Sequence, residues 1–476
     1  MRAKHILNTE YDGSKAWHNL ALLFVVVLCL ILCAPVLRNA EENIEYPLDS
    51  VRNAIPYVQQ FDAFMKGQAE LDVTPDARLA ELENPYSPEE REEIPFLWDR
   101  AYYNGQYYSY FGIAPILTVY FPYYVFTGAL PSAVTVCFIL AAFSVVFTAL
   151  AFREVILRFC PHAKLYMVLA ALFAVIFGGG LYAGLSWSDN YYIAVLSAIQ
   201  NSMAFIFFAM RGMRTESLSK RCVLFAVSAV CLTLTVWSRP TAALMCLALA
   251  PLILDFFIKA FKENIRSALA SAVSFLGVLT VGAGLVMYFN AVRFSSPLDF
   301  GAAYQLTVSD ISENKISFSL FGEAMTAYFL QLPSIMERFP FVTRSYLKFD
   351  AAGRYIYTAS SVGAFSFGLP AASLLAPFAA RIKEDKARFL TFVSVIVLSV
   401  LLAFSDFCLG GVNLRYLLDF LPILTLFSAS GLLILHGRTK GATRAVVTAA
   451  AFLLFCMASL MVLGIIIGNG KDFLFG

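Results

Sequence analysis

Long apolar runs, separated by short basic segments, follow one another along most of this 476-residue chain. A run of about 20 apolar residues is long enough to cross the hydrocarbon core of a bilayer as a helix. The pattern therefore predicts an all-α polytopic membrane protein with eleven membrane-spanning helices. We expect these helices near residues 19–37, 131–152, 165–185, 191–210, 222–238, 241–258, 268–289, 360–380, 389–408, 416–435 and 445–467.

The composition supports lipid as the solvent for much of the chain. Hydrophobic residues make up 59% of the sequence and charged residues only 14%, with a mean hydropathy of +0.70. A soluble domain carries about 25% charged residues. A water-soluble fold could not hide this much apolar surface, because a folded surface must be partly polar. One helical bundle with inserted loops fits better than several soluble domains.

The basic residues between the apolar runs predict how the bundle is oriented. Lysine and arginine concentrate in cytoplasmic loops of membrane proteins. Arg2, Lys4 and Lys15, together with the basic residues of the alternate loops, predict a cytoplasmic amino terminus. An odd number of spans then places the carboxyl terminus outside the plasma membrane. The basic residues of the alternate loops are Arg153, Arg158, Lys164, Arg211, Arg214, Lys220, Arg221, Lys259, Lys262, Arg266, Arg381, Lys383, Lys386, Arg388, Arg438, Lys440 and Arg444.

Two long segments are then expected on the outer side. Between Arg38 and Tyr110 there are fifteen acidic and six basic residues, in contrast to the basic loops. The apolar stretch that follows contains Pro115 and Pro122 and several tyrosines, which favours interfacial or re-entrant helices over a span. The predicted parts are residues 1–37 with the first helix, the outer loop 38–130, helices in 131–289, a second outer segment 290–359, and helices in 360–476.

Cysteine and histidine chemistry is not expected on the outer side. None of the nine cysteines falls in 38–110 or 290–358, and no pair has zinc-ligand spacing, so we expect inert, mostly buried thiols. All four histidines lie on or near the predicted cytoplasmic side. Carboxylates would therefore carry any acid–base chemistry outside, and a divalent cation, if one binds, would have oxygen ligands.

Residues 84–112 form the segment richest in candidate chemistry. Asp99 lies beside Trp98 and a run of tyrosines, and aromatic rings with a few polar groups are a common surface for binding sugars. A plain alternative is an interfacial aromatic belt with a hairpin turn at Asn104-Gly105. The candidate substrate-binding residues are Asn84, Trp98, Tyr102, Tyr103 and Tyr107.

Several charged residues lie at the predicted outer ends of spans: Asp189, Arg239, Arg293, Arg415 and Asp419. Ionisable groups at membrane depth are costly, so they are candidates for function. An isolated arginine there could simply extend to the headgroups. Three arginines with acidic partners on one face instead favour a phosphate-binding site, because the guanidinium binds phosphate oxygens in pairs.

These motifs resemble those of the GT-C superfamily of membrane glycosyltransferases. The resemblance is to its protein mannosyltransferase and aminoarabinose transferase group, and most closely to a bacterial branch of it. It rests on WDxxYYNGxYYxYFG at Trp98–Gly112, RFxSPxxFGxxYQL at Arg293–Leu306, and the pair Arg415-Tyr416. The order of loops and spans is also similar over most of the chain.

The resemblance implies an inverting hexosyl- or pentosyltransferase that takes a sugar from a polyprenyl-phosphate donor on the outer face of the membrane. The acceptor would be a glycan, lipid or protein, and nucleic acid is not an expected partner. Arg239, Arg293, Arg415 and Tyr416 would hold the donor phosphate. Residues Ala54-Ile55 occupy the positions of the family's acidic pair. The base is therefore Asp49 or Asp99, with Asp189 as a supporting carboxylate or cation ligand.

Two other functions are compatible with such a bundle. A lipid or saccharide transporter, or flippase, would need charges near the membrane centre and matched broken helices, whereas the charges here gather at the outer rim. A non-catalytic envelope scaffold would need only solvated loops.

Overall fold

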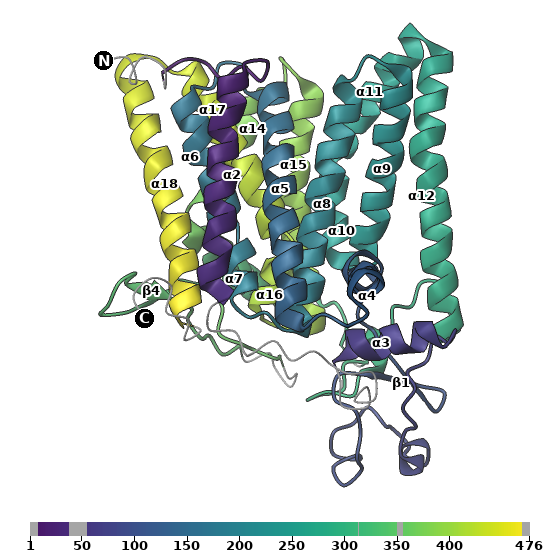
Figure 1. Cartoon of the computed structure of the whole chain (residues 1–476). Coiled ribbons are helices and arrows are strands. Elements are labelled where there is room, and N and C mark those ends of the chain that lie inside the picture. The colour runs from purple at the N-terminus through teal and green to yellow at the C-terminus, as the bar shows by residue number, and fades with distance from the viewer. Residues whose placement is uncertain (1–7, 38–54, 313, 350–355, 469–476) are drawn as a thin grey trace.

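The structure is a computed structural model, and it describes residues 8–37, 55–312, 314–349 and 356–468. Among these residues, ten helical segments are long and apolar enough to cross a membrane, and they pack side by side in one bundle (Figure 1). The fold is thus the predicted all-α polytopic bundle. The segments are α2 (Ala16–Leu37), α5 (Ala133–Phe159), α6 (Leu165–Gly178) with α7 (Leu181–Leu185), α8 (Asn190–Arg214), α9 (Leu218–Val236), α10 (Pro240–Cys246) with η4 (Leu247–Leu249) and α11 (Ala250–Glu263), α12 (Ile265–Phe294), α15 (Lys386–Gly410), α17 (Leu421–Arg438) and α18 (Gly441–Gly468).

The predicted span at 360–380 has a different form. It consists of η8 (Ala364–Phe367), η9 (Leu369–Leu375) and α14 (Ala376–Ala380). Thr358 bridges to Val412 beyond the end of α15, while the Ala380 carbonyl accepts a 2.7 Å bond from Arg388 in the first turn of α15. The segment therefore runs antiparallel to the whole of α15. A 3₁₀ helix rises about 2.0 Å per residue, against 1.5 Å in an α-helix, so fewer residues cover the distance.

The two ends of the bundle differ in charge and in loop length. At one end, here called the basic end, short links carry the arginines and lysines. There the buried Glu154 carboxylate pairs with Arg153, Arg211 and Arg214 at 3.0–3.4 Å. The other end, here called the loop end, carries the two long segments. Helix α2 begins at the basic end and α18 finishes at the loop end (Figure 1).

The two long segments fold together at the loop end. Strands β1 (Ala101–Tyr103) and β2 (Gln106–Tyr108) form an antiparallel hairpin. Its turn, Asn104-Gly105, has φ values of 49° and 74°, the left-handed conformation of a tight hairpin, so the predicted turn is confirmed. Ala101 also bridges to Gln305, and the buried Leu306 joins the small core of the first segment. The two motifs that carry the family resemblance are therefore in contact.

Short helices connect this loop region to the bundle. Helix α3 (Pro56–Met65) lies across the helix bundle at its loop end (Figure 1). The apolar stretch predicted as interfacial forms η3 (Ile116–Tyr120) and α4 (Phe121–Thr127), and it is too short to count among the membrane-spanning helices. No residue of α4 is buried, and Phe126 is 88% exposed. Such an apolar, exposed helix fits a position at the membrane interface.

Candidate functional site

Arg415 is the centre of a charged cluster at the loop end of the bundle. It lies on the short helix α16 (Leu414–Leu417), which Asn413 caps by accepting the Arg415 N–H at 3.0 Å. The guanidinium carbon lies 4.4 Å from the centre of the Tyr191 ring and 5.0 Å from that of Tyr416, and Nη2 donates to the Tyr416 hydroxyl at 3.1 Å. These two rings fix the orientation of a flat cation.

Two buried carboxylates from distant parts of the chain lie within electrostatic reach of Arg415. Asp99 precedes β1 with a φ of 53°, and its N–H donates to the Leu306 carbonyl at 3.0 Å. Asp189 is the N-cap of α8, where its Oδ1 accepts the Tyr192 N–H at 3.0 Å. The charge of Arg415 acts on both carboxylates. The cluster therefore joins the outer loop, α8 and α16.

The surroundings change the proton affinity of both carboxylates. Burial raises the pKa of Asp99 above that of an ordinary aspartate, and Arg415 opposes the rise. Burial likewise raises the pKa of Asp189, opposed by the Tyr192 N–H and Arg415. A carboxylate with a raised pKa is a better proton acceptor once ionised. The site therefore holds two potential bases beside one cation.

An aromatic wall borders the same cluster. The Tyr110 and Phe111 rings stack with their centres 4.4 Å apart. The centre of the Phe111 ring lies 5.6 Å from that of Tyr57 of α3 and 5.7 Å from that of Tyr191. The Tyr57 hydroxyl is buried and has no hydrogen-bond partner among the described residues. Buried polar atoms are nearly always paired. An unpaired hydroxyl in this wall is consistent with a ligand group that completes it.

Arg239 and Asp419 form a closed ion pair in this region. Arg239 Nε and Nη2 donate to the two carboxylate oxygens of Asp419 at 2.5 and 2.8 Å, and Thr241 donates to Oδ2 at 2.7 Å. The predicted phosphate ligand Arg239 is thus already neutralised. The buried carboxylate of Asp406 lies close enough to interact electrostatically with both, and its Oδ2 has no hydrogen-bond partner among the described residues.

Arg293 makes two hydrogen bonds and ring contacts within the protein. Its Nη1 donates to the Ser109 carbonyl at 2.6 Å and its Nη2 to Asn290 Oδ1 at 2.8 Å. Its guanidinium carbon also lies 4.1 Å from the centre of the Phe289 ring. With its donors directed at the protein, Arg293 fastens the end of α12 to the residue after β2. Its Nε is buried and has no hydrogen-bond partner among the described residues, and its proposed role at the donor phosphate stays a prediction.

The predicted sugar-binding residues fall into two groups. Tyr102 and Tyr107 are buried in the loop-region core, where the Tyr107 hydroxyl accepts the Leu97 N–H at 3.2 Å. Asn84 donates to Asp310 at 2.8 Å and so ties the two long segments together. These three residues stabilise the loop region. Trp98 remains 50% exposed next to Asp99, and Tyr103 is half-buried. The other catalytic candidate, Asp49, lies outside the described residues.

The structure adds two arginines that the sequence did not single out. Arg344, in the second long segment, has its guanidinium carbon 4.8 Å from the centre of the Trp187 ring and interacts with Tyr192 beside Asp189. Arg100 donates to Gln59 Oε1 at 2.7 Å, and burial lowers its pKa to about 10. Arg344 lies far from any predicted span end, so its hydropathy context gave no signal. Arg100 adjoins the candidate Asp99.

Within the described part of the chain, no group of three or more histidine, cysteine, aspartate or glutamate side chains could hold a metal ion. All nine cysteines are free and seven of them are buried. The described histidines, His18, His162 and His436, interact with residues of the basic end. At the charged cluster, Asp99 and Asp189 are the carboxylates, and the Cys137 sulfur lies 3.9 Å from the Asp189 carbonyl oxygen.

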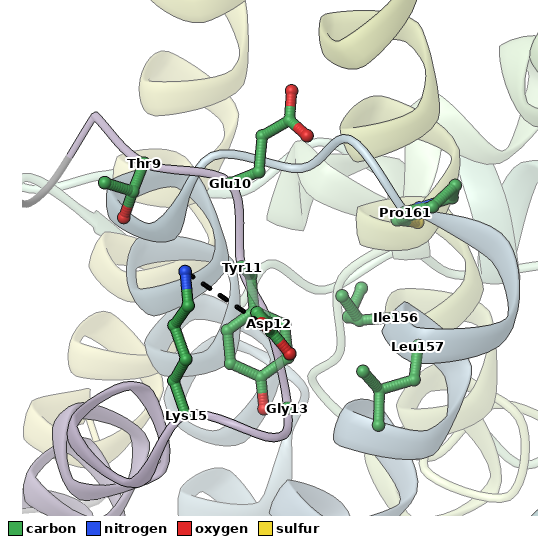
Figure 2. Close-up of a pocket in the computed structure, with 10 residues that line it drawn as sticks. Thr9, Glu10, Tyr11, Asp12, Gly13, Lys15, Ile156, Leu157 and Pro161 are labelled. Carbon is green, nitrogen blue, oxygen red and sulfur yellow. Dashed lines mark ion pairs between the residues drawn. The ribbon is translucent and has the colours of Figure 1, made fainter.

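Two cavities lie away from the charged cluster. An apolar one of about 220 Å³ opens between η7 (Thr326–Leu330), η9, α15 and α17, with Met325, Phe329 and Leu374 in its wall. The other, of about 630 Å³, is at the basic end and is shown in Figure 2. Its wall includes Tyr11, and Asp12 pairs there with Lys15 at 3.9 Å. Phe329 in the wall of the apolar cavity stacks on Phe420, the neighbour of Asp419, with 5.7 Å between the ring centres.

Comparison with solved structures returns oligosaccharyltransferases. A crystal structure of the Archaeoglobus fulgidus oligosaccharyltransferase in its apo form matches with a TM-score of 0.47 and 11% identity over 94% of this chain. The same enzyme tethered to an acceptor peptide matches with a TM-score of 0.44 and 13% identity. The chain spans 56% and 55% of the length of these proteins. No protein-family model and no curated protein sequence matches it.

Proposed function

We propose that this protein is an inverting glycosyltransferase that moves a sugar from a polyprenyl-phosphate donor to an acceptor at the loop end of the bundle. The observation that carries the proposal is Arg415, held between two aromatic rings and flanked by the buried carboxylates Asp99 and Asp189. One cation for a leaving phosphate and one base for an incoming hydroxyl are the minimum requirements of such a transfer.

The transfer needs a base that removes the acceptor's proton as its oxygen attacks the anomeric carbon. Asp99 fits this role because burial raises its pKa and the exposed ring of Trp98 adjoins it. Asp189 fits the role of an orienting carboxylate, because the first turn of α8 fixes it. A single displacement with no covalent sugar–enzyme intermediate inverts the anomeric carbon. Asp49 remains the second candidate for the base.

The lipid phosphate leaves with negative charge, which a nearby cation must stabilise. Arg415 is placed for this role, and its two planar nitrogen donors match a pair of phosphate oxygens. Tyr416 keeps the guanidinium in place through a hydrogen bond. Arg239 would contribute only if the phosphate displaced Asp419 from it. If the reaction also uses a divalent cation, Asp189 would supply one carboxylate ligand and the ion would add positive charge for the leaving phosphate.

The lipid part of the donor needs an apolar surface that begins in the bilayer. The 220 Å³ cavity provides one, since apolar side chains line most of it and Leu330 and Leu374 at its edge are about half exposed. Its neighbour Phe329 stacks on Phe420 at 5.7 Å, one residue from Asp419. A polyprenyl chain bound here would end near the charged cluster. On the proposed orientation, the loop end is the outer face of the plasma membrane.

A transfer assay tests the proposal directly. The purified protein in lipid vesicles is given radiolabelled polyprenyl-phosphate sugars, hexoses and pentoses, with glycan, lipid and peptide acceptors. We expect transfer with inversion. We also expect Asp99→Asn to reduce the rate about 10²- to 10⁴-fold, the usual contribution of a general base, and Arg415→Ala to reduce it about 10²- to 10³-fold.

The matched controls are Asp76→Asn and Arg78→Gln, an exposed pair in the same loop region. Both control variants should keep full activity. Absence of donor binding and of transfer across the whole donor panel would refute the proposal. Movement of the intact donor across the vesicle membrane without sugar transfer would instead support the alternative function, that of a transporter or flippase.

A further inference from the structure

The second long segment carries a small hairpin with an unusually apolar exposed surface. Strands β3 (Ser334–Ile335) and β4 (Val342–Thr343) pair antiparallel. Leu332 is 76% exposed and Ile335 89%, while Phe339 and Phe341 in the turn are each 54% exposed. Monomeric soluble proteins rarely leave such side chains together in water, and their clustering marks an interaction surface.

The hairpin is pressed against the last turns of α18. The Thr343 hydroxyl donates to the Gly464 carbonyl at 3.0 Å. A Cβ atom at Gly464 would lie only 1.9 Å from the Val342 carbonyl oxygen, so the close approach depends on glycine. Figure 1 shows this hairpin reaching sideways past the end of α18, whereas the β1–β2 region extends away from the bundle end. The hairpin therefore lies beside the bundle.

The sequence of α18 sets the depth of the hairpin in the membrane. Arg444 is the charged residue nearest the start of the helix, and Gly464 follows it by 20 residues, all uncharged. At 1.5 Å per residue this distance is about 30 Å, the thickness of the hydrocarbon core. The residues after Gly464 are three isoleucines. If Arg444 marks the boundary of the hydrocarbon at the basic end, the contact with Val342 and Thr343 would lie near the opposite boundary.

We infer that the β3–β4 hairpin inserts its apolar side chains into the headgroup–acyl boundary of the leaflet at the loop end. The partner is the lipid of the bilayer that the bundle spans, since the hairpin continues the lipid-facing surface of α18. The exposed Glu337 and Arg338 limit the depth to the interface, and the arginine can reach lipid phosphates. Apolar rings flanked by charges are typical of segments that lie in this layer.

The insertion has a consequence for the charged cluster. Arg344 directly follows β4, and its guanidinium lies over the Trp187 ring near Tyr192. Because Arg344 directly adjoins the hairpin, its position near Tyr192 would depend on where the hairpin is anchored. The inference itself does not depend on the proposed function, because it rests on exposure, depth and the contact with α18.

Fluorescence quenching tests the insertion. Phe339→Cys is labelled with an environment-sensitive fluorophore in a background where Cys456 and Cys222, the two cysteines that are not buried, are serine. The protein is reconstituted in phosphatidylcholine vesicles with nitroxide lipids. We expect a blue-shifted emission that nitroxides near the headgroup and upper chain quench. The control is Glu83→Cys, exposed in the loop region, where nitroxide lipids should leave the emission unchanged.

Two further variants check that the quenching at residue 339 reports the position of the hairpin. Ile335→Cys should be quenched in the same way, in case the change at Phe339 disturbs the turn. Gly464→Leu should weaken the quenching at residue 335, because its side chain would displace the hairpin from α18. Emission at 335 and 339 that resembles the Glu83→Cys control would overturn the inference. A blue shift that lipid nitroxides do not quench would also overturn it, since the hairpin would then be covered by protein.

Discussion

Arg415 and Asp99 are the residues whose chemistry is most closely coupled. The raised pKa of Asp99 reflects burial that Arg415 only partly offsets. The same cation is needed for the leaving phosphate in the proposed reaction. One arginine would therefore serve two functions: it keeps the base ionised, and it stabilises the departing group. The first function affects the pH at which activity falls, and the second affects the maximal rate.

The pH profile of transfer should reveal this coupling. A base must be ionised, so activity falls as the pH drops through the pKa of Asp99. Arg415→Gln removes the positive charge that favours the carboxylate, which raises this pKa further and shifts the acid limb of kcat/KM to higher pH. Arg415→Lys keeps the charge and should leave the limb near its original position. An acid limb that stays unchanged in Arg415→Gln would exclude Asp99 as the titrating base.

At the scale of elements, α10 and the start of α17 are joined through a single buried ion pair. Arg239 is the N-cap residue of α10, and Asp419 lies two residues before α17. Their bidentate contact, with Thr241 as a third partner, leaves little room for a substrate phosphate. We therefore expect this pair to contribute mainly to the stability of the bundle.

A double-mutant cycle on this pair checks that expectation. Asp419→Asn leaves the buried Arg239 cation without its bidentate partner and should lower the free energy of unfolding by up to roughly 3–5 kcal/mol, the usual effect of breaking a buried pair, with the nearby Asp406 carboxylate offsetting part of the loss. The double variant Arg239→Gln, Asp419→Asn should recover part of that loss, because no unpaired charge remains. Thermal unfolding in detergent measures both. Strictly additive effects would mean that the two side chains do not stabilise each other.

The elements themselves could largely be predicted, whereas their assembly could not. Long apolar runs predict spans because a backbone in lipid must satisfy its own hydrogen bonds, and Asn104-Gly105 predicts its hairpin for a local steric reason. The contact of Ala101 with Gln305 is non-local, so no pattern in the sequence indicated it. Arg239, Arg293 and Arg415 looked alike because each ends or begins a span. Only the tertiary structure shows that Arg239 binds Asp419 and that Arg293 bonds to Ser109 and Asn290.

For the whole molecule, the separation of the two ends is the property on which the proposed function depends. The basic end carries the arginines around Glu154, and the loop end carries the acidic first long segment and the charged cluster. Basic loops favour the cytoplasmic side. The charged cluster would then face a lipid-linked donor in the outer leaflet. A carboxyl terminus on the outer side requires an odd number of crossings, and the segment from η8 to α14 would be the eleventh beside the ten long apolar helices.

Reporter fusions decide whether that segment crosses. Alkaline phosphatase is active only outside the cytoplasm, and we expect it to be inactive when fused after Lys383 and active when fused after Gly468. The outcome at Lys383 follows from the contact between Ala380 and Arg388 at the start of α15, and the outcome at Gly468 follows from the end of α18 at the loop end (Figure 1). Green fluorescent protein at the same two positions should give the opposite pattern. Phosphatase activity at Lys383 would show that residues 364–380 return to the side they left, which would leave ten crossings and place both ends of the chain on one side.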